Sequence, residues 1–383
     1  MAAVAAVAVA AAVPDRGSGS SVFSAFGRAD PTPWLLASTE PQGRWVTLAH
    51  LTKGTPAELA AAHDAVLADG ATRVLLDTIP DWYNPANVSG HDRCQLPTNL
   101  LDLLADIGVT AEDDPRIAHL LDQMLEHPDA DGRFQVFAVQ RSGPAVWGCL
   151  LCDTHAIADI ELRFGRGSDP RVRRALAAAE TDLVDTDLGR AWPCRPDAVT
   201  GFRGPGRKGE PCPQTMLEAL RAFSWLPDAE RPEWLPEVTH TIFEIWRQRG
   251  TRKPYMMGHG RQFKTVKWPP TWYGAYEVVD VLGRLPETWR DVPEDRQSLA
   301  EIAACLLAYN VASDGRVTPL SAFRVFPELS ITQKKEPSPL ATALLWSRLA
   351  PLESIAEDVM AVDVLALGSS KGGTGTPMPP RVD

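Results

Sequence analysis

Apolar residues recur at three-to-four-residue spacing through most of the chain, which is the period of amphipathic α-helices. One set of such segments shares a layout in which a polar or aromatic start leads into a strongly apolar stretch. These starts lie 54 to 67 residues apart, near Pro41, Gln95, Leu150, Cys212, Thr271 and Ser338. The regular recurrence predicts a repeat of helical units.

A second set of predicted helices alternates with the first and carries more charge. Its members span residues 55–67, 114–126, 169–181, 231–247, 293–308 and 353–367. Three of them begin with Thr55, Asp114 or Asp169 followed by proline, which is a helix cap with Pro at the first helical position. Strand-like alternation is scarce, and residues 133–140 are the one good short candidate.

Six helical hairpins predict an all-α fold. An open solenoid and a closed ring both satisfy the pattern, and we expect a closed (α/α)6 toroid with the more apolar helices inside, over residues 22–367. Residues 1–21 are expected to be a disordered leader, since their Ala/Val run is too short to span a bilayer and has no basic segment before it. The Gly/Ser/Thr/Pro-rich residues 368–383 are expected to be a disordered tail.

The composition of the chain limits the kinds of molecule that it is expected to bind. The chain is 44% apolar and 23% charged, with 38 Lys and Arg against 49 Asp and Glu and a net charge of −11. This acidic balance argues against nucleic acid, and no stable membrane span is expected. The six cysteines are dispersed along a long chain, which favours a cytoplasmic protein without structural disulfides. The Gly-rich basic residues 204–208 lack the P-loop pattern, so no nucleotide is expected.

The predicted ring places the N-termini of the first helix set at one mouth, where reactive residues gather. The candidate catalytic residues are Asp153, Cys152, His91, Asp92 and Glu336. His91 beside Asp92 fits an oriented acid or base, and Asp153 fits a general acid if an apolar wall raises its pKa. Each also has a structural interpretation: a helix cap for Asp153, a solvated loop for His91 and Asp92, and a surface charge cluster for Glu336.

Three cysteines at the same mouth suggest a metal. Cys152, Cys194 and Cys212 precede or begin helices of neighbouring repeats, and with His91 or Asp153 they make a tetrahedral zinc site possible. Their spacings of 42 and 18 residues match no local zinc motif, so metal-free thiols and inert packing stay open. Zinc is thus the one cofactor the sequence suggests.

Aromatic residues and one lysine are the candidate substrate-binding groups. They are Trp147, Trp192, Lys208, Trp268, Trp272 and Tyr273. Indole and phenol rings pack against apolar chains and stabilise cations, while lysine holds an anionic group. Core packing is the alternative for every ring. Together they favour a hydrophobic or planar ligand.

This layout resembles the terpenoid cyclase/protein prenyltransferase α/α toroid superfamily, and in particular bacterial squalene-cyclase-like or prenyltransferase-like proteins. The resemblance rests on residues 147–153, 192–194, 204–213, 268–273 and 334–339. It implies a toroid whose members cyclise isoprenoids, prenylate proteins or join thioethers, several with zinc at one end of the ring. Two acidic motifs of the superfamily are incomplete here, since residues 185–188 lack the last Asp of Asp-x-Asp-Asp and residues 113–117 lack the third acid of Asp-Asp-x-x-Asp.

Four functions follow as hypotheses. The first is a terpene-cyclase-like enzyme that encloses an isoprenoid or other apolar substrate and drives cyclisation, isomerisation or elimination by acid/base chemistry at Asp153 or His91. The second is a zinc-thiolate transferase or cyclase of the prenyltransferase or lanthionine-cyclase type. The third is a glycan-active enzyme with two opposed carboxylates from Asp92, Asp153 and Glu336. The fourth is a non-catalytic binding module.

Overall fold

A computed structural model describes residues 21–87, 91, 93–137, 144–207, 209–252, 257–258, 260–271 and 273–368. Helices account for 53% and strands for 5% of the structure, which confirms the all-α class. Among the described residues, no helix combines the length and the apolar character that crossing a membrane requires.

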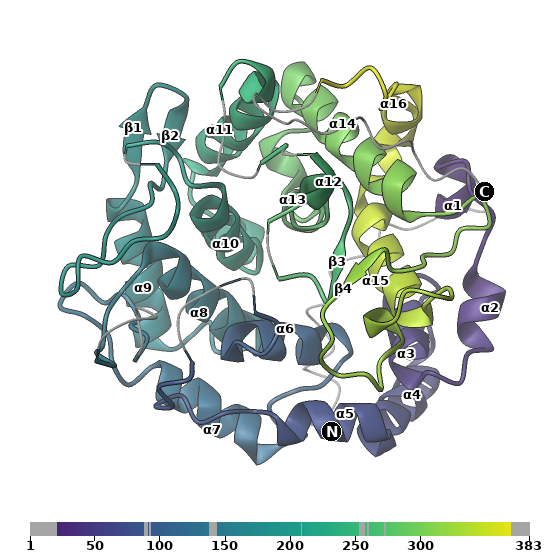
Figure 1. Cartoon of the computed structure of the whole chain (residues 1–383), viewed down its shortest axis with the longest axis horizontal. Coiled ribbons are helices and arrows are strands. Elements are labelled where there is room, and N and C mark those ends of the chain that lie inside the picture. The colour runs from purple at the N-terminus through teal and green to yellow at the C-terminus, as the bar shows by residue number, and fades with distance from the viewer. Residues whose placement is uncertain are drawn as a thin grey trace. The chain divides into compact units, whose positions relative to one another are not determined.

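Both predicted sets of helices are present (Figure 1). The first set consists of α3 (Pro41–His50), α6 (Pro97–Asp106), α8 (Leu151–Arg163), α10 (Pro213–Ser224), α13 (Ala275–Gly283) and α15 (Pro339–Leu349). The second set consists of α4 (Pro56–Ala68), α7 (Pro115–Met124), α9 (Pro170–Thr181), α11 (Leu235–Arg247), α14 (Pro293–Asn310) and α16 (Ala356–Ala361). The sequence period therefore located the repeated helices to within a few residues, except that the last one, predicted over residues 353–367, ends at Ala361.

Shorter helices fill the connections. They are α1 (Val22–Ala25), α2 (Thr32–Leu36), α5 (Gly70–Asp77) and α12 (Gly260–Lys264), together with 3-10 turns at Asp228–Glu230, Gln248–Gly250, Pro286–Thr288, Ser330–Thr332 and Ala350–Ile355. The predicted caps are confirmed where proline follows them. Thr55 forms a capping box with Glu58, and the carboxylates of Asp114 and Asp169 each accept a backbone N–H of the first turn.

The strands are short and differ from the prediction. β1 (Val184–Thr186) pairs antiparallel with β2 (Gly189–Ala191), and β3 (Lys267–Trp268) pairs parallel with β4 (Ser321–Ala322). The strand predicted over residues 133–140 is wrong for its described part, which makes only isolated bridges. Phe134 and Val136 are buried, and each makes only a single backbone bridge, to Pro128 and Gly148 respectively. Alternate residues are therefore buried here although no continuous strand pairing forms.

The chain divides into two compact units. Unit 1 comprises residues 1–74, 106–109 and 245–383, and unit 2 comprises residues 75–105 and 110–244. Within unit 1, α15 packs against both α3 and α13, while α3 also packs on α4 and α13 on α14 (Figure 1). The first and last repeats are thus direct neighbours. The carboxylate of Glu40 joins them by accepting the backbone N–H groups of Ser330 at 2.9 Å and Leu340 at 3.0 Å.

Within unit 2, α8 packs against both α9 and α10. Nearly every residue of α8 is buried, although four of them are ionisable: Asp153, His155, Asp159 and Glu161. A helix buried on all sides is normally apolar all round. Buried ionisable groups cost free energy unless they are paired or neutralised, so this helix is where unit 2 departs from ordinary core packing.

Candidate functional site

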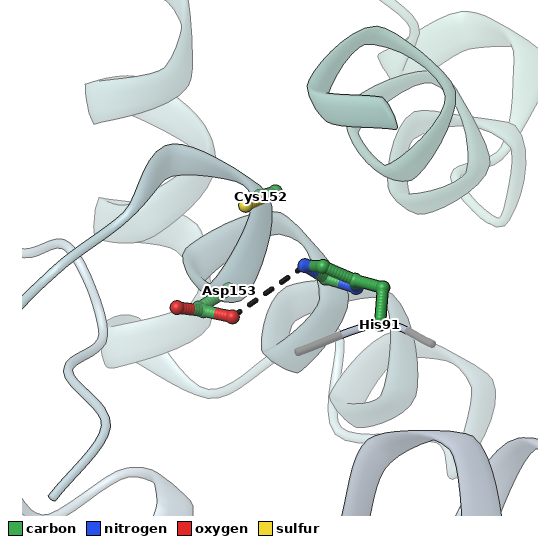
Figure 2. Close-up of side chains that lie close together, drawn as sticks. All are labelled: His91, Cys152 and Asp153. Carbon is green, nitrogen blue, oxygen red and sulfur yellow. Dashed lines mark ion pairs between the residues drawn. The ribbon is translucent and has the colours of Figure 1, made fainter. Parts of the chain in front are cut away.

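His91, Cys152 and Asp153 come together in unit 2 (Figure 2). One ligand atom from each residue, a ring nitrogen, a thiol sulfur and a carboxylate oxygen, lies within 4.8 Å of the other two. His91 Nε2 lies 3.5 Å from Asp153 Oδ1. His91 and Asp153 are 5% and 4% exposed, while Cys152 is half-buried. The structure therefore groups three of the five predicted catalytic residues.

The start of α8 separates the two cysteines of the Cys149-x-x-Cys152 pair. The Cys149 N–H donates to Asp197 Oδ1 at 2.8 Å, and its sulfur lies 3.1 Å from the Thr154 hydroxyl. Cys152 instead belongs to the group with His91 and Asp153. Because the two thiols have different neighbours, Cys149 serves as a matched control for Cys152.

The opposite side of the imidazole faces a second carboxylate. His91 Nδ1 lies 3.4 Å from Glu218 Oε1 on α10. Gln214, one turn earlier on α10, donates to that same oxygen at 2.5 Å. Each ring nitrogen of His91 therefore faces one carboxylate oxygen. If Nδ1 carries the proton, Nε2 presents a lone pair to Asp153, an arrangement that is favourable only with a cation or a second proton between them.

Buried charges set the electrostatics of this group. Burial alone would raise the pKa of Glu218, but the hydrogen bond from His91 and the charge of Arg221 hold this pKa below its usual value. For Cys152, burial raises the pKa well above the usual value, and the negative charges of Asp153 and Cys194 add to the effect. Without a cation close by, the Cys152 thiol keeps its proton.

Cys194 and Cys212 form a separate thiol pair in unit 2. The Cys194 sulfur accepts the S–H of Cys212 and the backbone N–H groups of Gly206 and Gly204, which lowers the pKa of Cys194 to about 6. The same hydrogen bond and burial raise the pKa of Cys212. The three cysteines of the predicted zinc set thus fall into two groups, Cys152 with His91 and Asp153, and Cys194 with Cys212.

The predicted aromatic residues of unit 2 take different positions. Trp147 is half-buried and stacks on His127 with ring centroids 3.9 Å apart. Trp192 has no exposed surface, and its indole N–H donates to the Ala179 carbonyl at 2.7 Å. Its ring packs edge-on against Trp234 at 5.5 Å. In this structure Trp192 packs against protein throughout, as a core side chain does.

The remaining predicted residues fall elsewhere. Trp268 and Tyr273 are buried in unit 1, and Glu336 is exposed in unit 1, where Gln333 bonds its backbone. Asp92, Lys208 and Trp272 lie outside the described residues. Of the predicted catalytic residues that the structure describes, His91, Cys152 and Asp153 form the group in unit 2 and Glu336 does not.

Several polar residues inside the helices were not predicted from the sequence as candidate site residues. These are Gln214 and Glu218 on α10 and His155, Asp159 and Glu161 on α8. For α10 a signal was available, because Gln214 and Glu218 are polar residues one turn apart in a largely apolar segment.

Burial shifts the pKa values of the α8 residues that were missed. It lowers the pKa of His155 to about 4, which keeps that imidazole neutral. It raises the pKa of Asp159 to about 7 and that of Glu161 to about 8. Trp225 Nε1 donates to Asp159 Oδ1 at 2.6 Å, whereas neither oxygen of Glu161 accepts a hydrogen bond from the described part of the chain. Strongly shifted groups concentrated on one helix are typical of functional sites.

Comparison with protein-family models gives no match, and comparison with curated proteins gives no match either. The function of the chain is therefore inferred from the geometry of unit 2.

Proposed function

We propose that the chain is an enzyme with a zinc centre held by His91, Cys152 and Asp153. The observation that carries the proposal is the placement of His91 between two carboxylates, with Nε2 at 3.5 Å from Asp153 and Nδ1 at 3.4 Å from Glu218, beside the Cys152 thiol. The donor set of imidazole, thiolate and carboxylate is the set that zinc accepts.

The surroundings of His91 fit a ligand role. A metal-binding histidine usually donates its other ring N–H to a carboxylate, which fixes the tautomer and aims the free nitrogen at the metal. Glu218 stands in that position, and Gln214 holds Glu218 in turn. In this proposal Glu218 is a positioning residue, and it leaves Nε2 directed toward Asp153.

The charge of the group supports a cation. Burial keeps Cys152 protonated, and the negative charges that Asp153, Glu218 and Cys194 bring to this place add to the effect. A divalent ion between the side chains would offset that charge and favour the Cys152 thiolate.

Three protein ligands leave a fourth position for a reacting group, as in catalytic rather than structural zinc sites. When bound, zinc supplies a Lewis acid that lowers the pKa of a coordinated thiol or water. Among the predicted functions, this favours a zinc-thiolate transferase or cyclase.

A second function has its own support. An imidazole between two carboxylates can also carry a proton, with Asp153 and Glu218 stabilising the imidazolium form. This arrangement suits the acid/base enzyme predicted to act on an isoprenoid or other apolar substrate. The same atoms serve both functions, so metal content separates them.

We also propose that the helices close into the (α/α)6 toroid. The packing of α15 on α3, together with the hydrogen bonds of Glu40, supports closure because it joins the last repeat to the first. All six cysteines are thiols, which supports the cytoplasm as the compartment. A crystal structure tests the closure directly.

The test of the zinc centre is metal analysis of the purified full chain. We expect about one zinc ion per chain, lost in Cys152→Ser and in His91→Ala and retained in Cys149→Ser. Cobalt substitution should give a thiolate-to-metal charge-transfer band that Cys152→Ser abolishes. A folded, metal-free chain that binds no added zinc would overturn the zinc proposal and favour the acid/base enzyme.

A further inference from the structure

The segments that carry Cys194 and Cys212 are fixed side by side. Pro193 and Pro211 form an antiparallel bridge, and the Cys212 N–H donates to the Trp192 carbonyl at 2.9 Å. Each cysteine follows directly after a bridging proline. The two thiols are close enough to interact, and Cys212 stabilises the Cys194 thiolate. The backbone thus holds two thiols together in the native fold.

A glycine loop closes over this thiol pair. A Cβ at Gly206 would lie 2.6 Å from the Cys194 Cβ, 3.2 Å from the Cys194 sulfur and 3.7 Å from the Cys212 sulfur. Both sulfurs therefore converge on one point that only glycine leaves open. The Arg203 guanidinium donates to the Gly206 carbonyl at 3.1 Å and holds the loop in place.

The two thiols differ in the way that a reacting pair requires. Cys194 is half-buried and accepts N–H groups from the glycine loop, so its thiolate is stabilised and within reach of solvent. Cys212 is 8% exposed and keeps its proton. In the neighbouring Cys149-x-x-Cys152 pair, burial raises the pKa of both thiols. Because the thiolate is the nucleophile, Cys194 is the thiol expected to react first.

We propose that Cys194 and Cys212 are a redox-active dithiol that a low-molecular-weight disulfide, such as oxidised glutathione, closes to an intramolecular disulfide. The Cys194 thiolate attacks one sulfur of the small disulfide, forms a mixed disulfide and releases one thiolate. Cys212 then gives its proton to solvent and attacks the Cys194 sulfur, releasing the second thiolate. The protein pair loses two electrons, and the small disulfide gains them.

A disulfide between Cys194 and Cys212 would constrain the loop between them, and this loop contacts the segment just before α8. Residues 195–211 lie between the two cysteines, and Asp197 in this loop accepts the Cys149 N–H at 2.8 Å. Cys149 precedes Cys152 by one helical turn of sequence. The dithiol is thus a modification site connected to the segment that begins α8. The proposal does not depend on whether a metal binds at His91, Cys152 and Asp153.

The experiment treats the purified full chain with oxidised glutathione and measures its intact mass, both after chelation and after zinc loading. We expect loss of the mass of two hydrogen atoms and, after proteolysis without reduction, a peptide that links Cys194 to Cys212. In Cys212→Ser the mixed disulfide with glutathione should persist at Cys194, because no second thiol resolves it. Cys194→Ser should abolish closure, and Cys305→Ser, in α14 of unit 1, should leave it unchanged.

Three results would overturn the proposal. A disulfide between Cys149 and Cys152, in place of one between Cys194 and Cys212, would show that another pair of thiols is the redox-active one. A wild-type chain that stops at the mixed disulfide would show that Cys212 does not resolve it. Protection of Cys194 by zinc, with zinc lost from Cys194→Ser, would make the pair part of the metal centre. A chain that binds no zinc but still forms the Cys194–Cys212 disulfide would contradict only the proposed function.

Discussion

In each unit a buried basic side chain lies between two acids, and the base is Arg348 in unit 1 and His91 in unit 2. In unit 1, the Arg348 guanidinium lies 2.5 Å from Asp106 and 2.8 Å from Asp280, and Arg284 also reaches Asp280 at 2.7 Å. In unit 2, the His91 imidazole lies between Asp153 and Glu218 at 3.5 and 3.4 Å. The two clusters thus share a geometry of charges and differ in distance and in the chemistry of the base.

The difference between the two bases indicates a structural role for one cluster and a chemical role for the other. Arginine keeps its proton in proteins, offers a fixed fork of N–H groups and forms short bonds to carboxylates. Imidazole gains and loses a proton near neutral pH and binds metals through a lone pair. Arg348 is therefore suited to holding α13, α15 and residue 106 together. His91 is suited to exchanging a proton or a metal.

The largest effect is expected from removing the arginine. Arg348→Ala leaves Asp106 and Asp280 buried without their shared partner, which should lower the free energy of unfolding by about 3–5 kcal/mol. Urea unfolding followed by circular dichroism measures this loss. His91→Ala should cost less stability while abolishing zinc binding. If His91→Ala were the more destabilising change, the imidazole would be the structural base and the comparison would fail.

The next effect tests the buried acid of α8. Burial raises the pKa of Glu161 to about 8, with the charge of Arg166 partly opposing it. A carboxyl with a raised folded-state pKa contributes stability that is fully present below its usual pKa and lost as pH rises through the folded value. Between about pH 4.5 and 8, Glu161 should therefore progressively destabilise the fold.

Glu161→Gln removes the titration and should be more stable than the wild type at pH 8 by on the order of 3 kcal/mol. Unfolding curves at a series of pH values measure the difference. Glu237→Gln, on α11 and in the exposed pair with Arg190, provides the control and should keep the pH dependence of the wild type, because Glu161 is still present. An equal slope in wild type and Glu161→Gln would show that the Glu161 carboxyl is not what opposes folding at high pH.

The helices of both units could be predicted from the sequence because their signals are local. Thr55, Asp114 and Asp169 cap helices through backbone N–H groups within three residues, and proline after each cap marks the first turn. Helical periodicity supplied the rest. The β1–β2 hairpin was missed because its strands have three residues each, too few for alternation to be recognised.

The site could be predicted only in part, for a physical reason. His91, Cys152 and Asp153 stood out because they precede or begin helices that the repeat aligns. Glu218 lies further along α10, where sequence period alone favours core packing. Its role follows from its distance to His91, and that distance depends on how the segment that carries His91 lies beside α10 in three dimensions. The division of the three cysteines into two groups likewise depends on the loop at Gly204 and Gly206.

A smaller effect is expected from the residue behind the imidazole. Glu218→Gln keeps the shape of the side chain but weakens its hold on His91 Nδ1, so zinc affinity should fall by about 10–100-fold. Competition with a chromogenic chelator measures the change. Glu210→Gln, in the partly exposed pair with Arg207, is the control and should leave affinity unchanged. Complete loss of zinc in Glu218→Gln would make Glu218 a ligand, and an unchanged affinity would remove its positioning role.

The smallest effect provides the baseline for the comparison. Arg296 bonds Asp358 at 2.7 Å in unit 1, in a geometry as short as that of Arg348, but the two side chains are 42% and 34% exposed. Water already solvates both charges, and holding the long side chain costs entropy. Arg296→Ala should therefore lower the free energy of unfolding by only about 0–1 kcal/mol.

The same urea titration, repeated in high salt, should shrink this small effect further and leave that of Arg348→Ala largely intact, because salt screens exposed charges more than buried ones. If Arg296→Ala and Arg348→Ala cost the same, burial would not be what distinguishes a structural ion pair here. The larger loss of stability expected for Arg348→Ala than for His91→Ala would then have to come from the chemistry of the two side chains and not from their burial.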